Sequence, residues 1–235
     1  MNARQDAFTR LELLAIIIAL LLVAMIAWPL RAGSKGTSQR AACYNNLRQI
    51  GFAAQSWADN YGDHVPWATF TTEGGTRPVT GFKAANAWAE FATLSNELVS
   101  PHVLACPNDS ATRVASHWGS AFNGFLNSGF RGNALSYFIS YHCQPELPRS
   151  VVSGDRDFRP SQPPPVSCAR GVNNAAGIML QPPNVVVWTN LVHVGAGHLL
   201  FTDGSVEYVA SAGLQRLFVG PDASDNGSIH IVNAK

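Results

Sequence analysis

The chain has 235 residues, a length that suits one helical anchor and one globular domain with a single core. Hydrophobic residues make up 46% of it and charged residues only 13%, about half the share in ordinary soluble domains, so uncharged polar residues must cover much of the surface. The net charge of +1 and the lack of a basic stretch with interleaved aromatic residues argue against nucleic-acid binding as the main role.

An uncharged apolar run over residues 13–30 is just long enough to cross the hydrocarbon core of a membrane as a helix. We expect a membrane-spanning helix over residues 11–30. Arginines and lysines flank the run on both sides, so the distribution of positive charge leaves its orientation open. A cleaved signal peptide and a plain signal anchor are alternatives; the run is long for the first and fits the second.

Neither alternative accounts for Glu12, which stands between Leu11 and the apolar run. A carboxylate deep in a membrane helix costs roughly 2.5–3.5 kcal/mol on insertion scales, and less near the interface. An acid kept at that cost usually has a partner. The simpler interpretation is a lone surface glutamate at the membrane edge.

Residues 7–14, Ala-Phe-Thr-Arg-Leu-Glu-Leu-Leu, resemble the prepilin cleavage and methylation motif, which is usually written Gly-Phe-Thr-Leu-Ile-Glu-Leu. In that family a dedicated peptidase cuts before the phenylalanine and methylates the new amino terminus. The resemblance implies a leader peptide over residues 1–7, cleavage between Ala7 and Phe8, and N-methylation of Phe8. Ala7 stands where the family has glycine.

The same resemblance gives Glu12 and Pro29 a role in assembly. Pro29 falls where the family tends to have a proline, and Arg10 departs from the pattern because it replaces an apolar residue. When subunits stack through parallel helices, the amino terminus of one subunit would neutralise Glu12 of its neighbour, which removes a cost that each buried charge would bear alone.

Apolar residues return at helical spacing after a Gly- and Ser-rich stretch at residues 32–38. They predict an amphipathic helix over residues 38–61 that packs one face on a head domain, with Gly62 and Pro66 preventing its continuation. Residues 8–61 therefore form the expected N-terminal helix.

Frequent glycine and proline in residues 62–235 predict an α+β head made of loops and short strands, and the resemblance implies that this head is periplasmic. The expected fold is α+β and pilin-like, with a long N-terminal membrane-spanning helix packed on a small antiparallel sheet. We expect helices over 84–100 and 210–218, strands over 136–141, 151–153, 185–189, 198–202 and 206–209, an exposed loop over 159–165, and a turn-rich segment over 220–227. Asp203-Gly204 marks the turn between the last two strands.

Short stretches after residue 40 resemble a second pattern, that of prepilin-like proteins of the Planctomycetes–Verrucomicrobia type, including a His-x9-Asp-Gly signature at His193 and Asp203. The resemblance covers residues 7 to about 218. The matching residues are Cys43, Asn45, Asn46, Leu47, Gly51, Cys106, Pro107, Asp109, Gly154, Asp155, Arg156, His193, Asp203 and Gly204.

These resemblances imply a structural, non-enzymatic pseudopilin-like subunit of a type II secretion or type IV pilus-like assembly. It would be a single-pass protein of the inner membrane with its head in the periplasm, and its partners would be the prepilin peptidase and other pilin-like subunits. The alternative is a membrane-anchored periplasmic module that binds polysaccharide or protein and does not polymerise. Six tryptophans would suit sugar binding but are equally expected in a core. An anchored hydrolase lacks a coherent nucleophile and base.

Several residues of the head are of types that ligate metals, namely Asp155, Cys168, His193, His198 and Asp203. The His-x4-His spacing fits no usual zinc motif, and a strand pair would turn the two rings to opposite faces. We therefore interpret these residues as structural: His193 bonds a loop, Asp203 caps the hairpin, and Asp155 pairs with Arg156.

Oxygen donors at Asp222, Asp225 and Asn226 are of the kind that binds calcium, although no loop template accompanies them. We expect no resident metal and no cofactor.

Four cysteines occur without a CxxC pair, which argues against a zinc knuckle or a thioredoxin-like site. An even number in a chain with an export signal favours two disulfides, and four buried thiols are the alternative. We expect Cys43 to pair with Cys106, closing a loop of roughly sixty residues worth about 4 kcal/mol in the chain-entropy model. Cys143 and Cys168 would form the second bridge.

Overall fold

The computed structural model divides the chain into two compact units, Met1–Arg40 and Ala41–Lys235. The predicted processing residues Ala7 and Phe8, Cys168, and the predicted calcium ligands Asp222, Asp225 and Asn226 lie outside the described residues. The structure describes residues 10–32, 34–79, 83–84, 86–141, 143, 147, 149–161, 172–173, 177–180, 182–219 and 229–232.

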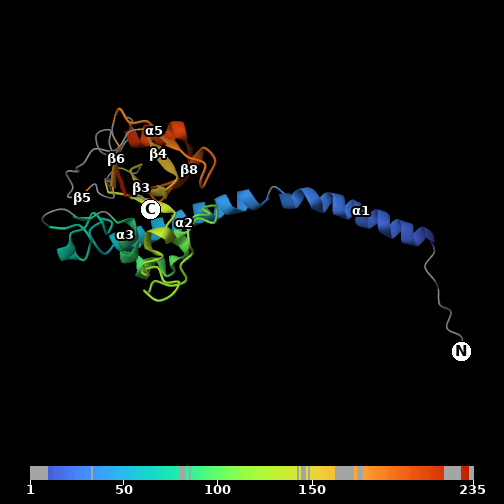
Figure 1. Ribbon diagram of the computed structural model, residues 1–235, viewed down its shortest axis with the longest axis horizontal. Coiled ribbons are helices and arrows are strands. Elements are labelled where there is room, and N and C mark those ends of the chain that lie inside the picture. Colours follow the sequence, from blue (N-terminus) through green and yellow to red (C-terminus); the bar gives the residue numbers. More distant parts are fainter. Residues whose placement is uncertain are drawn as a thin grey trace. The chain divides into compact units, whose positions relative to one another are not determined.

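The first unit contains helix α1, Arg10–Ala32 (Figure 1). Consecutive leucine, isoleucine and alanine residues place apolar side chains on every face of this helix. From Leu11 to Met25 these side chains are exposed; Leu11 is 82% exposed and Met25 is 68% exposed.

The predicted membrane-spanning helix over residues 11–30 is not borne out. Among the described residues, no helix combines the length and the apolar character that crossing a membrane requires. The prediction of a single-pass inner-membrane protein with a periplasmic head is therefore wrong, and so is the membrane-spanning part of the predicted fold class.

Helix α2, Ser34–Ala58, enters the second unit at Ala41 and packs there through the expected apolar face. The buried side chains on this face are Cys43, Leu47, Ile50, Ala54 and Trp57. The helix ends three residues before the predicted end at residue 61, because the backbone turns at Gly62 and Asp63, both with positive φ.

A six-stranded antiparallel sheet in the order β6-β10-β2-β3-β8-β9 forms the centre of the second unit. Every residue of β2, β3 and β8 is buried, so both faces of the central strands are covered. The strands are β2 (Tyr137–Ser140), β3 (Val151–Asp155), β6 (Gly177–Leu180), β8 (Ala196–Phe201), β9 (Val206–Ala210) and β10 (Ile229–Val232).

Alternate residues of the strands supply two cores, because side chains of a strand point to opposite faces in turn. Tyr137 and Ile139 of β2 join the larger core with α2, whereas Phe138 joins a second core with helix α5, Ser211–Val219. Figure 1 shows α2 and α5 on the two sides of the sheet. The second unit is thus a helix–sheet–helix arrangement, which confirms the α+β class.

The remaining elements are short. Helices α3 (Ala87–Thr93) and α4 (Ser95–Leu98) replace the single helix predicted over 84–100 and are separated at Leu94. Strand β4 (Phe158–Pro160) pairs with β7 (Val186–Trp188), and a two-residue parallel pair joins β1 (Lys83–Ala84) to β5 (Val172–Asn173). Within the described ranges, 3₁₀ helices cover Thr71–Glu73, Pro101–Leu104 and Arg131–Ala134.

Candidate functional site

Many of the family-pattern residues converge on the segment Gly154-Asp155-Arg156-Asp157, at the end of β3. A Cβ atom at Gly154 would lie 2.7 Å from the carbonyl oxygen of His198 and 2.8 Å from the ring of Phe138, so only glycine fits between these neighbours. The three charged residues that follow each bind a different part of the second unit.

Asp155 lies fully buried between two histidines. Its Oδ2 accepts the backbone N–H of His198 at 2.7 Å and lies 3.0 Å from Nδ1 of the same residue. The same oxygen is 3.4 Å from Nε2 of His193. The two imidazole rings are 5.0 Å apart, and the Tyr208 ring lies 4.9 Å from that of His198. The result is a buried His–Asp–His cluster.

Arg156 forms its ion pair with Asp109, not with Asp155 as predicted. Its Nε lies 2.8 Å from Oδ2 of Asp109 and its Nη2 donates to Oδ1 at 3.0 Å, so the pair is bidentate. The hydroxyl of Ser136 also donates to Asp109, at 2.9 Å, and accepts the backbone N–H of Cys106 at 3.0 Å. The prediction was wrong because Arg156 faces the segment that follows Cys106.

Asp157 fixes the loop that carries His193. Its Oδ2 accepts the backbone N–H of Val192 at 2.7 Å and that of His193 at 3.4 Å, and its Oδ1 accepts from the Thr189 hydroxyl. Burial raises the pKa of Asp157, although the backbone donors of the loop oppose that change. The carboxylate thus sets the position from which His193 reaches Asp155.

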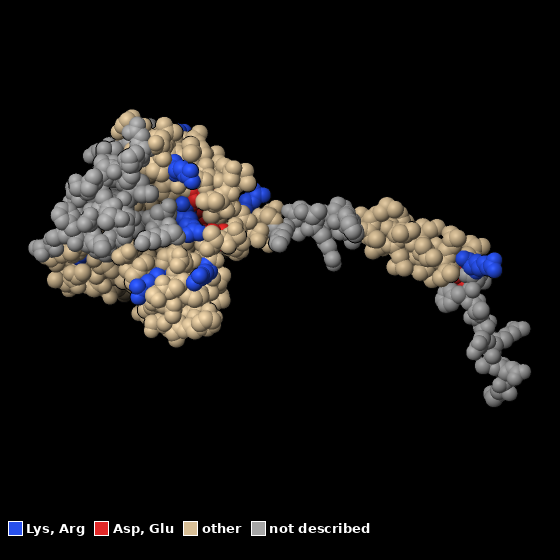
Figure 2. Space-filling model, in the orientation of Figure 1, with Lys and Arg blue, Asp and Glu red and all other residues tan. Residues whose placement is uncertain are grey.

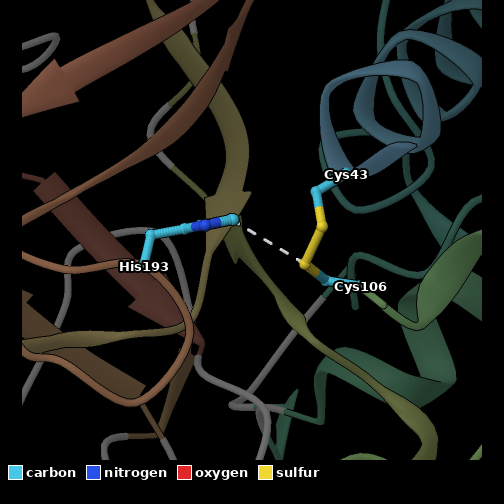
Figure 3. A group of neighbouring side chains, drawn as sticks. All are labelled: Cys43, Cys106 and His193. Carbon is cyan, nitrogen blue, oxygen red and sulfur yellow. Dashed lines mark hydrogen bonds between the residues drawn. A yellow bond between two sulfur atoms is a disulfide. The ribbon is translucent and has the colours of Figure 1, made fainter. Parts of the chain in front are cut away.

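A disulfide joins Cys43 of α2 to Cys106, which confirms the expected pairing (Figure 3). The two Cα atoms are 5.0 Å apart, and 63 positions separate the residues in the sequence. Figure 3 shows His193 pointing at this bond, with Nε2 at 3.8 Å from Sγ of Cys106. Cys143 is buried, but its expected partner Cys168 lies outside the described residues, so that pairing stays a prediction.

Two asparagines complete the site. Asn46, on α2, donates to the carbonyl oxygen of Ala105 at 3.0 Å. Asn108 donates to the carbonyl oxygen of Val192, and its amide nitrogen lies 3.3 Å from Nδ1 of His193. Both asparagines hold the segment around Cys106 against its neighbours.

Other residues of the family pattern lie elsewhere. Leu47 is buried in the core, and a Cβ atom on Gly51 would come within 2.8 Å of Leu200. Asp203 accepts from the backbone and the hydroxyl of Ser205 at 2.9 and 2.6 Å, and Gly204 has φ +78°, so these two residues form the hairpin turn as expected. Asn45 and Pro107 are exposed.

The predicted opposition of the two histidine rings is wrong. His198 lies in β8, but His193 lies in the loop before that strand, and the loop brings it back to the same carboxylate. Sequence reasoning also missed Asp157, Asn108 and Tyr208. Asp157 and Asn108 stand inside stretches that resemble the family pattern, at Gly154-Asp155-Arg156-Asp157 and Cys106-Pro107-Asn108-Asp109, but were given no role there; nothing in the sequence marks Tyr208.

The described part of the surface in Figure 2 is mostly uncharged, with individual charged side chains between. Comparisons with family models, with curated proteins and with solved structures find no match for the chain.

Proposed function

We propose that the chain is a structural subunit of a pseudopilin-like assembly, of the type II secretion or type IV pilus-like kind, in which copies associate through their N-terminal helices. The observation that carries the proposal is the exposed apolar surface of α1 over residues 11–25. A helix that is apolar on every face is stable in water only when other apolar surface covers it. Burial of that surface contributes about 25 cal/mol per Å².

The part of α2 that belongs to the second unit is held firmly there. A subunit that is joined to other subunits through its N-terminal helix requires such a connection. From Ala41 onward the helix lies in the core, the Cys43–Cys106 bond ties it covalently, and Asn46 adds a hydrogen bond. A load on this part of the helix is therefore carried by a disulfide and a buried face together.

The proposal includes processing and a charge pair. Cleavage between Ala7 and Phe8 would create a new amino terminus four residues before Glu12. That terminus, methylated at Phe8, would neutralise Glu12 of a neighbouring copy, and Pro29 is the other residue that the resemblance assigns to assembly. The partners are then a prepilin peptidase and other pilin-like subunits.

A structural role suits the buried cluster better than catalysis does. Asp155 is 0% exposed and the two histidines 2% and 3%. Side chains that are buried this completely cannot contact a macromolecular substrate unless the loop that covers them unfolds. We propose that they organise the fold and are no acid–base unit.

The assembly is tested with the full chain carrying a photo-crosslinking residue at position 13, within the exposed surface. Crosslinked multimers are expected, and Ile17→Asp should reduce them more than tenfold, because an aspartate buried between helices costs several kcal/mol. Val114→Asp is the matched control, since Val114 is 56% exposed and Ile17 is 49% exposed. A wild-type chain that yields only monomers, or equal effects of both substitutions, would refute the proposal.

The second candidate is a binding module, and a cavity of about 490 Å³ in the second unit favours it. Ala54 and Ala58 of α2 line it together with Val65, Val152, Leu200 and Phe201. Its size suits a small ligand or a short segment of a polymer. Saturable binding of an oligosaccharide by a chain that forms no multimers would favour this candidate over assembly.

A further inference from the structure

We infer that Asp155, His193 and His198 form a binding site for a divalent transition-metal ion, with Zn²⁺ as the first candidate. One ligand atom of each residue can be chosen so that all three lie within 4.8 Å of one another, and all three residues are buried. This site is independent of the proposed assembly.

Two of the three distances between ligand atoms are close to those of a tetrahedral site, and the third is at most 4.8 Å. Oδ2 of Asp155 lies 3.0 Å from Nδ1 of His198 and 3.4 Å from Nε2 of His193. In a tetrahedral site with bonds of 2.0–2.1 Å, neighbouring ligand atoms are about 3.3 Å apart. An ion between the three atoms would therefore replace the present hydrogen bonds with metal–ligand bonds.

The ligand types select the class of ion. Two imidazoles and one carboxylate are a donor set that zinc uses when a fourth position is left to water or another ligand. Calcium and magnesium prefer oxygen ligands throughout, so this site would discriminate against them.

The distribution of hydrogen bonds on Asp155 is a second observation in favour of a cation. Three nitrogen atoms crowd Oδ2, whereas Oδ1 is buried and has no hydrogen-bond partner among the described residues. A buried carboxylate oxygen without a partner costs about 1–3 kcal/mol. A cation held at Oδ2 would neutralise the charge of this buried carboxylate, which hydrogen bonds reach on one oxygen only.

The surroundings hold both histidines in place, as metal ligands require. Asp157 fixes the backbone of His193, and the backbone N–H of His198 is bonded to Asp155 itself. Binding through Nε2 of His193 puts the proton on Nδ1, next to the Asn108 amide. The Asn108 side chain must then turn so that its oxygen accepts this proton. Tyr208, 45% exposed, lies against both rings and marks the side from which an ion enters.

The nearby sulfur atoms form a competing ligand set. Cys43, Cys106 and His193 also offer atoms within 4.8 Å of one another. Only thiolates bind zinc strongly, and the disulfide holds both sulfur atoms in a form that does not. While the disulfide is intact, the ion therefore belongs on the side of Asp155 and His198.

The test is titration of the chelator-treated, non-reduced full chain with Zn²⁺ in a calorimeter, together with the absorption spectrum of the Co²⁺ form. One ion per chain and a rise of the thermal unfolding midpoint are expected. His198→Ala should weaken binding by more than the roughly 10- to 100-fold that loss of an outer-shell partner costs. His117→Ala is the matched control and should bind like the wild type, because His117 is exposed and bonds only within its own loop.

Asp155→Asn is a second variant, which keeps the shape of the side chain and removes its charge. Circular dichroism without metal shows whether His198→Ala and Asp155→Asn are folded. Each variant that is folded should lose zinc binding. The inference is overturned if the folded wild type binds no stoichiometric ion, or if either folded variant binds as the wild type does. It is equally overturned if binding appears only after the disulfide is reduced, because the thiolates are then the ligands.

Discussion

Three consecutive charged residues at the end of β3 serve three separate contacts. Asp155 binds two histidines, Arg156 forms a bidentate pair with Asp109, and Asp157 accepts from the loop before β8. Each charge is largely removed from water, so each has to be satisfied by its own partners. Neighbouring positions in the sequence therefore stabilise segments that are far apart along the chain.

Asp157→Ala should lower the free energy of unfolding by roughly 2–4 kcal/mol, because it leaves two buried backbone donors, those of Val192 and His193, without an acceptor. Asp203→Ala is the matched control: Asp203 also accepts two hydrogen bonds, but it is exposed and water replaces it, so the loss should stay below about 1 kcal/mol. Urea denaturation of both variants measures the difference. Equal losses would contradict the role given to burial.

At the scale of elements, the disulfide is the covalent link between α2 and the segment that leads into the sheet. It closes a loop between residues separated by 63 positions, and such a loop restricts the unfolded chain strongly. The exposed face of helix α2 is polar apart from Ala41 and Phe52, and the helix depends on tertiary packing for its place.

Replacing both Cys43 and Cys106 by alanine should lower the free energy of unfolding by about 4 kcal/mol in the chain-entropy model. The measurement is urea denaturation under non-reducing conditions, with the wild type treated identically. Far-UV circular dichroism of the variant should show the helix content of the wild type, because the buried face of α2 remains. A loss under about 1 kcal/mol would mean that the folded contacts alone fix the helix.

The elements that the sequence predicted well are those with local signals. Strands β2, β3, β7, β8 and β9 fall within about two residues of their predicted positions, since apolar runs bounded by turn residues mark them. Strand β4 was taken for part of a proline-rich loop, because its pairing with β7 depends on a distant partner.

The candidate site was predictable only as a set of residues. The resemblance selected Cys43, Cys106, Asp155 and His193, and helix placement indicated the pairing of the two cysteines. The contacts of Asp155 with two histidines were not predictable, because they depend on the path of a loop. The apolar run up to residue 30 led to the prediction of a membrane span, and no helix among the described residues bears it out.

At the scale of the whole molecule, the two units have different chemistry. The second unit buries its apolar residues in two cores, whereas the described side chains of α1 expose theirs. Proteins that leave a continuous apolar surface exposed normally use it for association. The proposed subunit role requires that the amino terminus next to this surface be processed.

We expect cleavage between Ala7 and Phe8 when the chain is produced together with a prepilin peptidase. Intact-mass spectrometry should show a chain that starts at Phe8 and carries one added methyl group. Methylation is expected on Phe8, and cleavage on the bond before it. An Ala7→Gly variant restores the residue that is usual in the family before this bond, so it should be cleaved at least as completely as the wild type. A product that still starts at Met1 or Asn2 with the peptidase present would refute this prediction.

The position of β10 has a consequence for the time course of folding. Residues 229–232 lie between β6 and β2, and β2 is some ninety residues earlier in the chain. Until synthesis reaches Ile229, one edge of β2 has no neighbouring strand, so its backbone donors and acceptors stay unpaired. Pairings of such sequence separation form slowly, because loop closure must precede them. The sheet therefore closes only after synthesis has passed residue 232, and until then a chaperone or a neighbouring nascent chain can occupy the vacant edge.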